Sequence, residues 1–363
     1  MKFLLCLSVC LSVACTDLLQ ACSVPVFRYA LERWDRDEYR LLIATKGKPS
    51  QKEKLWIDDI ISKSFLMEGY SNFRVNHVDI LNESNAELLE HLPSLKKVER
   101  SSLVLLYPRS IHQKKIAWQS DLAESYAEGL LHSRIIEKVN HKILTGISTV
   151  WLLVESKDSK KNQEIIEMVN RIISELKNEM KLPAGVMEAS GKVTGGSSKH
   201  QEPLDVDPEN VLNSGIPLTI DFSLVRMTEE DREPMLRSML KNLNEETESM
   251  KDEPMLIPFF GRGRFLSPMV GDMIKPEFIK SASEYLTEAC SCQVKAQNPG
   301  YDSLSHLDWI SYLEGTKLIG ASSQEIKEED ELVQSEIKGM YLFILIGCGM
   351  IPFLLVYLFR RKP

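Results

Sequence analysis

The chain has 363 residues, of which 43% are hydrophobic and 26% are charged, so it is long enough for two ordinary domains with buried cores. This composition excludes a disordered chain. The net charge is -8 and the pI is near 5.6. Because a phosphate-binding surface needs an excess of lysine and arginine, the acidic balance argues against a nucleic acid partner.

The N-terminus is typical of a secretory signal peptide. Lys2 precedes an apolar run at residues 3–14, which is too short to span a bilayer at about 1.5 Å per residue. Small residues at possible cleavage sites predict that residues 1–21 are the leader, with cleavage after Ala14 as an alternative. A further alternative is a lipoprotein signal, in which Cys22 or Cys15 is lipidated.

The C-terminus is typical of a membrane anchor. Residues 340–359 are uncharged, and they have about the length that a hydrocarbon core of roughly 30 Å requires. An acidic stalk is expected at residues 311–339, and the basic tail at residues 360–363 should be cytoplasmic. The bulk of the chain then lies on the periplasmic side, where disulfides can form. The expected partners are the membrane and another envelope protein.

Strands and helices alternate along the body of the chain. Short apolar runs bounded by turn residues predict strands at residues 39–45, 72–80, 101–108, 115–119, 148–156, 217–227, 254–261 and 264–270. Apolar residues at helical spacing predict helices at residues 55–65, 86–91, 120–132, 165–176, 229–243 and 276–289. Ser50 is the expected N-cap of the first of these helices.

The order of the elements predicts the fold class. The first half reads βαβαββα, which is the order of the thioredoxin fold, and the second half repeats it more loosely. We therefore expect an α/β protein with two tandem thioredoxin-like domains followed by a single C-terminal transmembrane helix. The expected domains are residues 22–138, with an extra N-terminal helix, and residues 139–310, with a Gly/Ser-rich insertion near residues 189–215.

The exported body contains three cysteines, Cys22, Cys290 and Cys292, because the other four lie in the leader or the expected membrane helix. One interpretation is a disulfide from Cys22 to Cys290 or Cys292, which would stabilise the fold by about 4 to 5 kcal/mol in the loop-entropy model. A second is a strained, reactive bond between Cys290 and Cys292. A third is a site of three thiolates for copper(I) or zinc.

The usual thioredoxin chemistry has no residues to support it. Redox enzymes of that fold place Cys-x-x-Cys between the first strand and the first helix, where the helix N-terminus stabilises a thiolate. Here the corresponding segments, residues 46–50 and 157–160, contain no cysteine. Catalysis by a dithiol at that place is therefore not expected.

Two further groups of polar residues are candidates for a site. Arg262 and Arg264 in FFGRGRF can offer a weak anion-binding site, but the same glycines fit a tight hairpin between two strands. Asp302, His306 and Asp308 lie close together in the sequence, and with no nucleophile beside them they predict a solvated or helix-capping cluster.

Three segments carry a resemblance to a known family: ACSVPVFRYALERW at residues 21–34, FGRGR at residues 260–264 and CSCQVKAQNPG at residues 290–300. Together they resemble a family of uncharacterised bacterial envelope proteins, over most of the chain. The resemblance implies secretion and a C-terminal anchor, and it supplies no catalytic residues.

These observations favour a membrane-anchored extracytoplasmic protein that is a non-enzymatic scaffold or interaction protein and needs no cofactor. One alternative is a thiol-disulfide or copper-handling protein that uses Cys22, Cys290 and Cys292. Another is an accessory subunit of a membrane transporter.

Overall fold

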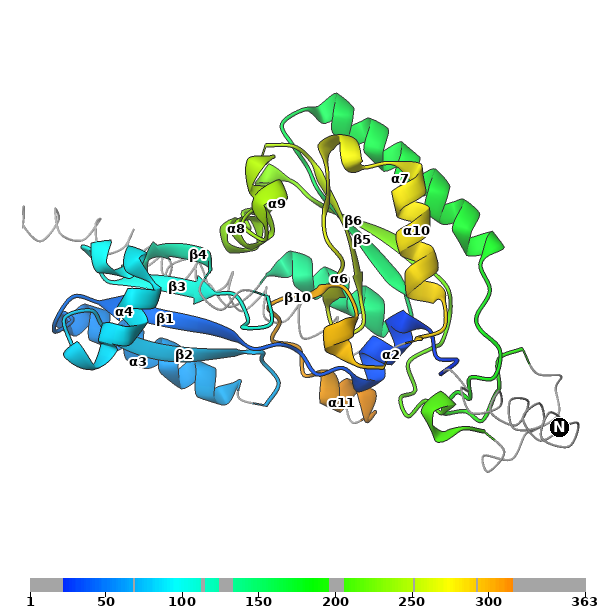
Figure 1. The fold of residues 1–363 in the computed structure, drawn as a ribbon, viewed down its shortest axis with the longest axis horizontal. Helices are drawn as coiled ribbons and strands as arrows, with labels where there is room; N and C mark the ends of the chain where they lie inside the picture. The colour runs from blue at the N-terminus through cyan, green and yellow to red at the C-terminus, as the bar shows by residue number, and fades with distance from the viewer. Residues whose placement is uncertain are drawn as a thin grey trace, which may run out of the picture. The chain divides into compact units, whose positions relative to one another are not determined.

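The computed structural model describes residues 22–67, 69–111, 115–123, 133–195, 206–250, 252–291 and 293–315 (Figure 1). These residues belong to one compact unit that ends at Gly315. They form two β-sheets with helices packed on them, so the predicted α/β class is confirmed.

The first sheet has the strand order β2-β1-β3-β4. Its strands are β1 (Tyr39–Thr45), β2 (Phe73–Asp79), β3 (Ser102–Leu106) and β4 (Ile116–Asp121). β1 pairs in parallel with β2 and antiparallel with β3, and β3 pairs antiparallel with β4. All four strands lie where the apolar runs predict them.

Helices connect the strands of the first sheet. α3 (Gln51–Leu66) links β1 to β2, and α4 (Ala86–His91) with the short turns η1 (Glu83–Asn85) and η2 (Pro93–Lys97) links β2 to β3. The expected N-cap of α3 is confirmed: the Ser50 hydroxyl accepts from the Glu53 amide at 3.2 Å, and the Glu53 carboxylate accepts from the Ser50 amide at 2.8 Å. This reciprocal pair satisfies two amides that a helix start otherwise leaves exposed.

One face of the first sheet packs against α4 and η2. The buried residues of this cluster are Leu42, Ala44, Val78, Leu89, Leu92, Leu95, Val98, Val104 and Leu106. Strand residues two apart share a face of the sheet, which is why alternate positions of β1 and β3 appear in it.

The second sheet has the strand order β10-β8-β7-β5-β6, with β9 also paired to β7. Its strands are β5 (Thr149–Val154), β6 (Phe222–Met227), β7 (Met255–Phe260), β8 (Arg264–Phe265), β9 (Met269–Val270) and β10 (Tyr301–Asp302). β5 pairs in parallel with β6 and antiparallel with β7, and β7 pairs antiparallel with β8 and β9. The pairing of β7 with β8 confirms the hairpin that the two glycines of FFGRGRF predict.

Two long helices cover one face of the second sheet. α7 (Ser159–Glu179), green in Figure 1, packs beside α10 (Pro276–Thr287), drawn in yellow. Their apolar faces meet the sheet in a cluster whose buried members are Trp151, Leu153, Ile165, Val169, Ile172, Leu176, Phe222, Leu256, Ile274 and Ile279.

Two further helices pack on the second sheet. α6 (Arg134–Leu144) contacts β5 and β6, and α2 (Val26–Arg33) contacts β7 and α10. The extra N-terminal helix that we expected is α2. We expected it to belong to the first domain, but it packs on β7 of the second sheet and on α10. The proposed limits at residues 138 and 310 stay a prediction.

Shorter elements complete the described fold. α8 (Pro234–Lys241) packs against β4 of the first sheet and is followed by α9 (Glu245–Ser249). The remaining elements are η4 (Pro208–Asn210), η5 (Glu229–Asp231), η6 (Gly271–Met273), η7 (Lys295–Gln297) and α11 (Trp309–Leu313).

Hydrogen bonds connect residues 302–305 to the first sheet. The Asn72 side-chain amide donates to the Ser303 main-chain oxygen at 2.9 Å and its oxygen accepts from the Ser305 amide at 2.9 Å. The Tyr39 hydroxyl donates to the Asp302 main-chain oxygen at 2.7 Å. A segment late in the chain thus completes contacts with strands near its start.

Several predicted elements differ from the structure. The expected helix at residues 229–243 is divided into η5 and α8, because Arg232 has a left-handed φ of 47° and Pro234 begins a new helix. The strand expected at residues 217–227 is shorter, since only Phe222–Met227 is paired. Helix α6 was not predicted.

Other expected segments lie outside the described residues: the leader at 1–21, most of the helix at 120–132, most of the stalk at 311–339, and the anchor and tail at 340–363. Within the part of the chain that the structure describes, no helix is both long and apolar enough to cross a membrane.

Candidate functional site

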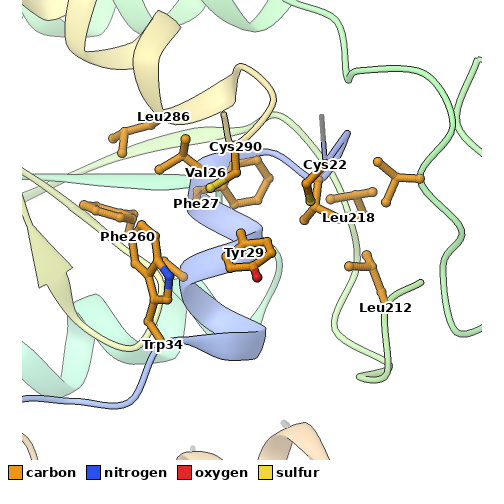
Figure 2. Packing of buried hydrophobic residues seen from close by; sticks show 13 residues of the cluster. Cys22, Val26, Phe27, Tyr29, Trp34, Leu212, Leu218, Phe260, Leu286 and Cys290 are labelled. Atoms are coloured by element: carbon orange, nitrogen blue, oxygen red, sulfur yellow. The ribbon is translucent and has the colours of Figure 1, made fainter. Parts of the chain in front are cut away.

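A buried apolar cluster surrounds α2, and we call it the N-terminal cluster (Figure 2). Its buried members are Cys22, Val24, Val26, Phe27, Tyr29, Ala30, Trp34, Val186, Leu212, Leu218, Phe260, Leu286 and Cys290. The cluster therefore joins the start of the body to β7, to α10 and to the segment that follows α10.

Main-chain pairing fixes the two cysteine-bearing segments beside each other. The Val26 amide donates to the Glu288 oxygen at 3.0 Å, and the Cys290 amide donates to the Val24 oxygen at 2.9 Å. These bonds flank an antiparallel bridge between Pro25 and Ala289. Two segments more than 260 positions apart in the sequence are thus held side by side by main-chain hydrogen bonds.

The Cys22 thiol lies in a site that favours its neutral form. Its side chain is 4% exposed, and the sulfur donates to the Glu209 main-chain oxygen at 3.6 Å. Burial raises the pKa of Cys22 above its usual 9.0; the hydrogen bond from the Val24 amide lowers it in part, and the carboxylate of Glu209 adds a smaller increase. A reactive cysteine needs the opposite environment, because the thiolate is the nucleophile.

Cys290 shares this environment. It is 1% exposed and lies in the same cluster as Cys22, but the two sulfurs are not bonded to each other. Burial raises the pKa of the neighbouring Tyr29 to about 12; Glu209 adds to the increase and Arg33 opposes it. The structure thus brings two of the three predicted cysteines into one cluster.

Cys292 lies outside the described residues. A bond from Cys22 or Cys290 to Cys292, and a site formed by three thiolates, therefore stay predictions. Among the residues that the structure does describe, no group of three histidine, cysteine or acidic side chains is placed to hold a metal ion.

Arg262 stabilises the C-terminus of α2. Its Nε donates to the Leu31 main-chain oxygen at 2.8 Å and one of its terminal nitrogens donates to the Glu32 oxygen at 2.9 Å. These are carbonyls that a helix end leaves without helical partners, and a cation there also complements the helix dipole. Burial lowers the pKa of Arg262, while Asp35 and Glu32 oppose the shift.

Arg264 is buried and bound to groups of the protein. It forms an ion pair with Asp302 at 3.2 Å and donates to the Asn298 main-chain oxygen at 3.0 Å. Its guanidinium carbon also lies 5.5 Å from the centre of the Trp34 ring, within range of a cation–π contact. The predicted anion-binding role of Arg262 and Arg264 has no support in this geometry, because both guanidinium groups bind the protein itself.

The glycines of the hairpin allow α2 and residue 303 to approach closely. Gly261 has a φ of 58°, and a Cβ at this position would lie 2.7 Å from the Cβ of Ala30. Gly263 has a φ of 81°, and its Cβ would lie 2.8 Å from the Ser303 hydroxyl oxygen. A side chain at either position would meet both a backbone penalty and a steric clash.

The segment after Cys290 is bound to the residues that follow α2. The Trp34 indole donates to the Gln293 main-chain oxygen at 2.9 Å. The Lys295 ammonium group pairs with Asp37 at 2.7 Å and with Asp302. The three segments that carry the family resemblance are therefore packed against one another, and most of their ion pairs are with residues outside them, at Asp35, Asp37, Glu209 and Asp302.

A buried ion pair on α2 was missed in the sequence. Arg28 and Glu32 are paired at 3.1 Å, with side chains 1% and 5% exposed. Ser214 joins them, since its hydroxyl accepts from Arg28 at 2.9 Å and donates to Glu32 at 2.7 Å. The four-residue spacing of an arginine and a glutamate was the available signal, but it does not reveal that the pair is buried.

The cluster of Asp302, His306 and Asp308 is only partly as predicted. Asp308 is the N-cap of α11, where its carboxylate accepts from the Ser311 amide at 3.1 Å, so the capping role is confirmed for this residue. Asp302 is 2% exposed rather than solvated, because Arg264 and Lys295 supply its counter-charges. The Nδ1 of His306 lies 2.9 Å from the Ser71 hydroxyl oxygen.

Comparison with known proteins adds no family assignment. No family model matches the chain, and neither the curated proteins nor the solved structures give a match. The resemblance to envelope proteins stays a prediction from the sequence, and the functional argument rests on the geometry.

Proposed function

We propose that this chain is a membrane-anchored extracytoplasmic protein with two thioredoxin-like domains that serve as a scaffold for binding rather than for thiol chemistry. The sequence supports export and anchoring through residues 1–21 and 340–359. Scaffolding by such domains is physically reasonable, because a fold does not bring an activity with it.

The two sheets support the thioredoxin-like classification. In the first, a parallel pair joined through a helix, β1 and β2, is extended beside β1 by the antiparallel strands β3 and β4. The second repeats this arrangement with β5 and β6 as the parallel pair and β7 and β8 as the antiparallel strands. The same strand arrangement in both sheets supports a repeated thioredoxin-like topology.

The non-catalytic proposal depends mainly on the burial of the Cys22 side chain. Its thiol is buried in an apolar cluster and its pKa is raised, so little thiolate forms near neutral pH. The segments between β1 and α3 and between β5 and α7, where a thioredoxin-like enzyme would hold its dithiol, contain lysine, serine and no cysteine.

A disulfide-reductase assay tests this proposal. Purified full-length protein in detergent is added to insulin and dithiothreitol, and insulin reduction is followed by turbidity. We expect no acceleration over buffer, and the same result for Cys22→Ser. Acceleration that disappears in Cys22→Ser would refute the scaffold proposal.

A fractionation experiment tests the anchor separately. The full-length chain should remain with membranes after extraction at high pH, whereas a chain that ends at residue 339 should be released. Recovery of the full-length chain in the soluble fraction would refute the anchor without affecting the non-catalytic assignment.

A second candidate, a thiol-disulfide protein, has one observation in its favour. Cys22 and Cys290 lie in one buried cluster, on segments whose main chains are hydrogen-bonded to each other. In the same insulin assay this candidate predicts activity that both Cys22→Ser and Cys290→Ser remove.

A further inference from the structure

Two buried polar atoms from different elements lie around one point beside the hairpin of β7 and β8. A Cβ on Gly263 would be 2.8 Å from the Ser303 Oγ and 3.1 Å from the Asn140 Oδ1. Ser303 directly follows β10, and Asn140 lies in α6. The two residues are 1% and 2% exposed. Because residue 263 is a glycine, no side chain of its own fills the point that both atoms adjoin.

Neither the Ser303 Oγ nor the Asn140 Oδ1 has a hydrogen-bond partner among the described residues. The remaining polar groups of both residues are bonded. The Asn140 Nδ2 donates to the Ser305 Oγ at 2.9 Å. The Ser303 amide donates to the Gly263 oxygen at 3.0 Å, and the Ser303 oxygen accepts from the Asn72 side chain at 2.9 Å. Both residues are thus held in place, and each keeps one polar atom without a partner in the described chain.

Reversing the side-chain amide of Asn140 does not satisfy these atoms. The Ser305 hydroxyl would then donate to the Asn140 oxygen, and the amide nitrogen would take the place beside Gly263 without an acceptor. Buried polar atoms in folded proteins are nearly always bonded, either to the protein or to an ordered water. The point beside Gly263 therefore calls for one small group that can both donate and accept.

We propose that a single structural water molecule is bound beside Gly263, where it bridges the Ser303 Oγ and the Asn140 Oδ1. A buried water is held by otherwise unsatisfied polar groups of this kind, and it needs at least two of them. A cation is a poorer match, because both oxygens are neutral and the guanidinium group of Arg264 belongs to the next residue.

The position of this water gives it a structural role. Ser303 and Ser305 belong to the segment that is hydrogen-bonded to Asn72 beside the first sheet, and Asn140 belongs to a helix that packs on the second sheet. The water thus joins α6 to the segment that connects the two sheets. The inference goes beyond the proposed scaffold function and is independent of the membrane anchor, because it depends only on these buried residues.

A crystal structure of the full-length protein in detergent, at a resolution that shows ordered solvent, tests the site directly. We expect a solvent peak within about 3.2 Å of both the Ser303 Oγ and the Asn140 Oδ1. A direct hydrogen bond between the two side chains would overturn the proposal, and so would the absence of a solvent peak between them.

Urea unfolding of Ser303→Ala provides a second test. This change removes an oxygen that has no partner among the described residues. If the oxygen binds the water, the unfolding equilibrium constant should rise about fivefold, because a buried hydrogen bond is lost. If the oxygen is unsatisfied, its removal should leave stability unchanged or raise it, and either result would overturn the proposal.

Ser283→Ala is the matched control. Ser283 is also a buried serine, but its hydroxyl donates to the Ile279 oxygen of its own helix at 2.8 Å. Its replacement should change the unfolding equilibrium constant by about twofold or less, because alanine is the better helix former. Equal losses in the two variants would overturn the proposal, since they would show only the general effect of replacing a buried serine.

A double-mutant cycle tests whether Ser303 and Asn140 act through one bridge. Asn140→Leu removes the other partner of the water, so the combined variant should lose less stability than the two single losses together predict. Combining Asn140→Leu with Ser283→Ala should give additive losses. Additive losses for Asn140→Leu with Ser303→Ala would overturn the bridge.

Discussion

Arg264 and Asp302 form an ion pair 3.2 Å long whose side chains are only 6% and 3% exposed. Arg264 begins β8 in the hairpin, and Asp302 ends β10. Asp302 also accepts from the Asp37 amide and pairs with Lys295. This one carboxylate therefore joins the hairpin, the segment after α10 and the start of the first sheet.

Removing the charge of Asp302 should destabilise the fold strongly. In Asp302→Asn the buried guanidinium of Arg264 loses its counter-charge, and an unpaired buried charge costs on the order of 3 to 5 kcal/mol. Urea unfolding followed by circular dichroism measures the free energy of unfolding.

Asp121→Asn is the matched control for this measurement. Its partner Arg100 is 83% exposed, and an exposed pair of this kind contributes about 0 to 1 kcal/mol. Equal losses in the two variants would show that the pair of Arg264 with Asp302 does not hold the segments together.

A methyl group at Gly261 should weaken the packing of α2. Gly261→Ala places a side chain at a φ of 58° and 2.7 Å from the Ala30 Cβ. Gly191→Ala is the control, because it has a φ of 81° and no atom within 4 Å of the added Cβ. Both variants meet the left-handed backbone penalty of about 1 kcal/mol, so the extra loss in Gly261→Ala measures the steric contact with α2. A difference of zero would contradict the close approach.

Local patterns predicted much of the fold. The bounds of β1 agree with the apolar run at residues 39–45, and α4 agrees with the helix at residues 86–91. The predicted N-cap of α3, Ser50, is also confirmed, and its partner Glu53 lies only three residues further along the chain. Such features depend on neighbours in the chain, so a single sequence contains them.

Contacts between distant segments were not predictable in the same way. Arg262 binds the end of α2 and Arg264 binds Asp302, and both partners are far from the hairpin in the sequence. The residues next to the two arginines would look the same if the arginines were exposed and bound an anion. Helix α6 was not predicted, although Ile135, Ile136, Val139 and Ile143 are buried at helical spacing. The N-terminal cluster could be recognised only in the three-dimensional structure, because its members come from segments far apart in the sequence.

The stability of the protein should depend on the ionisation of Glu233. This side chain is 9% exposed, and burial raises its pKa above the usual 4.5, against amide hydrogen bonds at the start of α6 that lower it. Because the folded state holds the proton more tightly, the stability that Glu233 contributes is present below pH 4.5 and is lost as pH rises through the folded-state pKa.

Glu233→Gln should remove that part of the pH dependence. The variant resembles the protonated side chain, so its free energy of unfolding should fall less than that of wild type as pH rises above 4.5. Urea titrations at several pH values test this. A parallel fall in both proteins would contradict the assignment to Glu233.

The reactivity of the Cys22 and Cys290 thiols tests the central claim most directly. Full-length protein in detergent is exposed to iodoacetamide with and without denaturant, and mass spectrometry resolves the labelling rate at each cysteine. Because both side chains are buried in one cluster and the pKa of Cys22 is raised, both should react at least about a hundredfold more slowly in the native protein. Native labelling of Cys22 at the denatured rate would contradict the account.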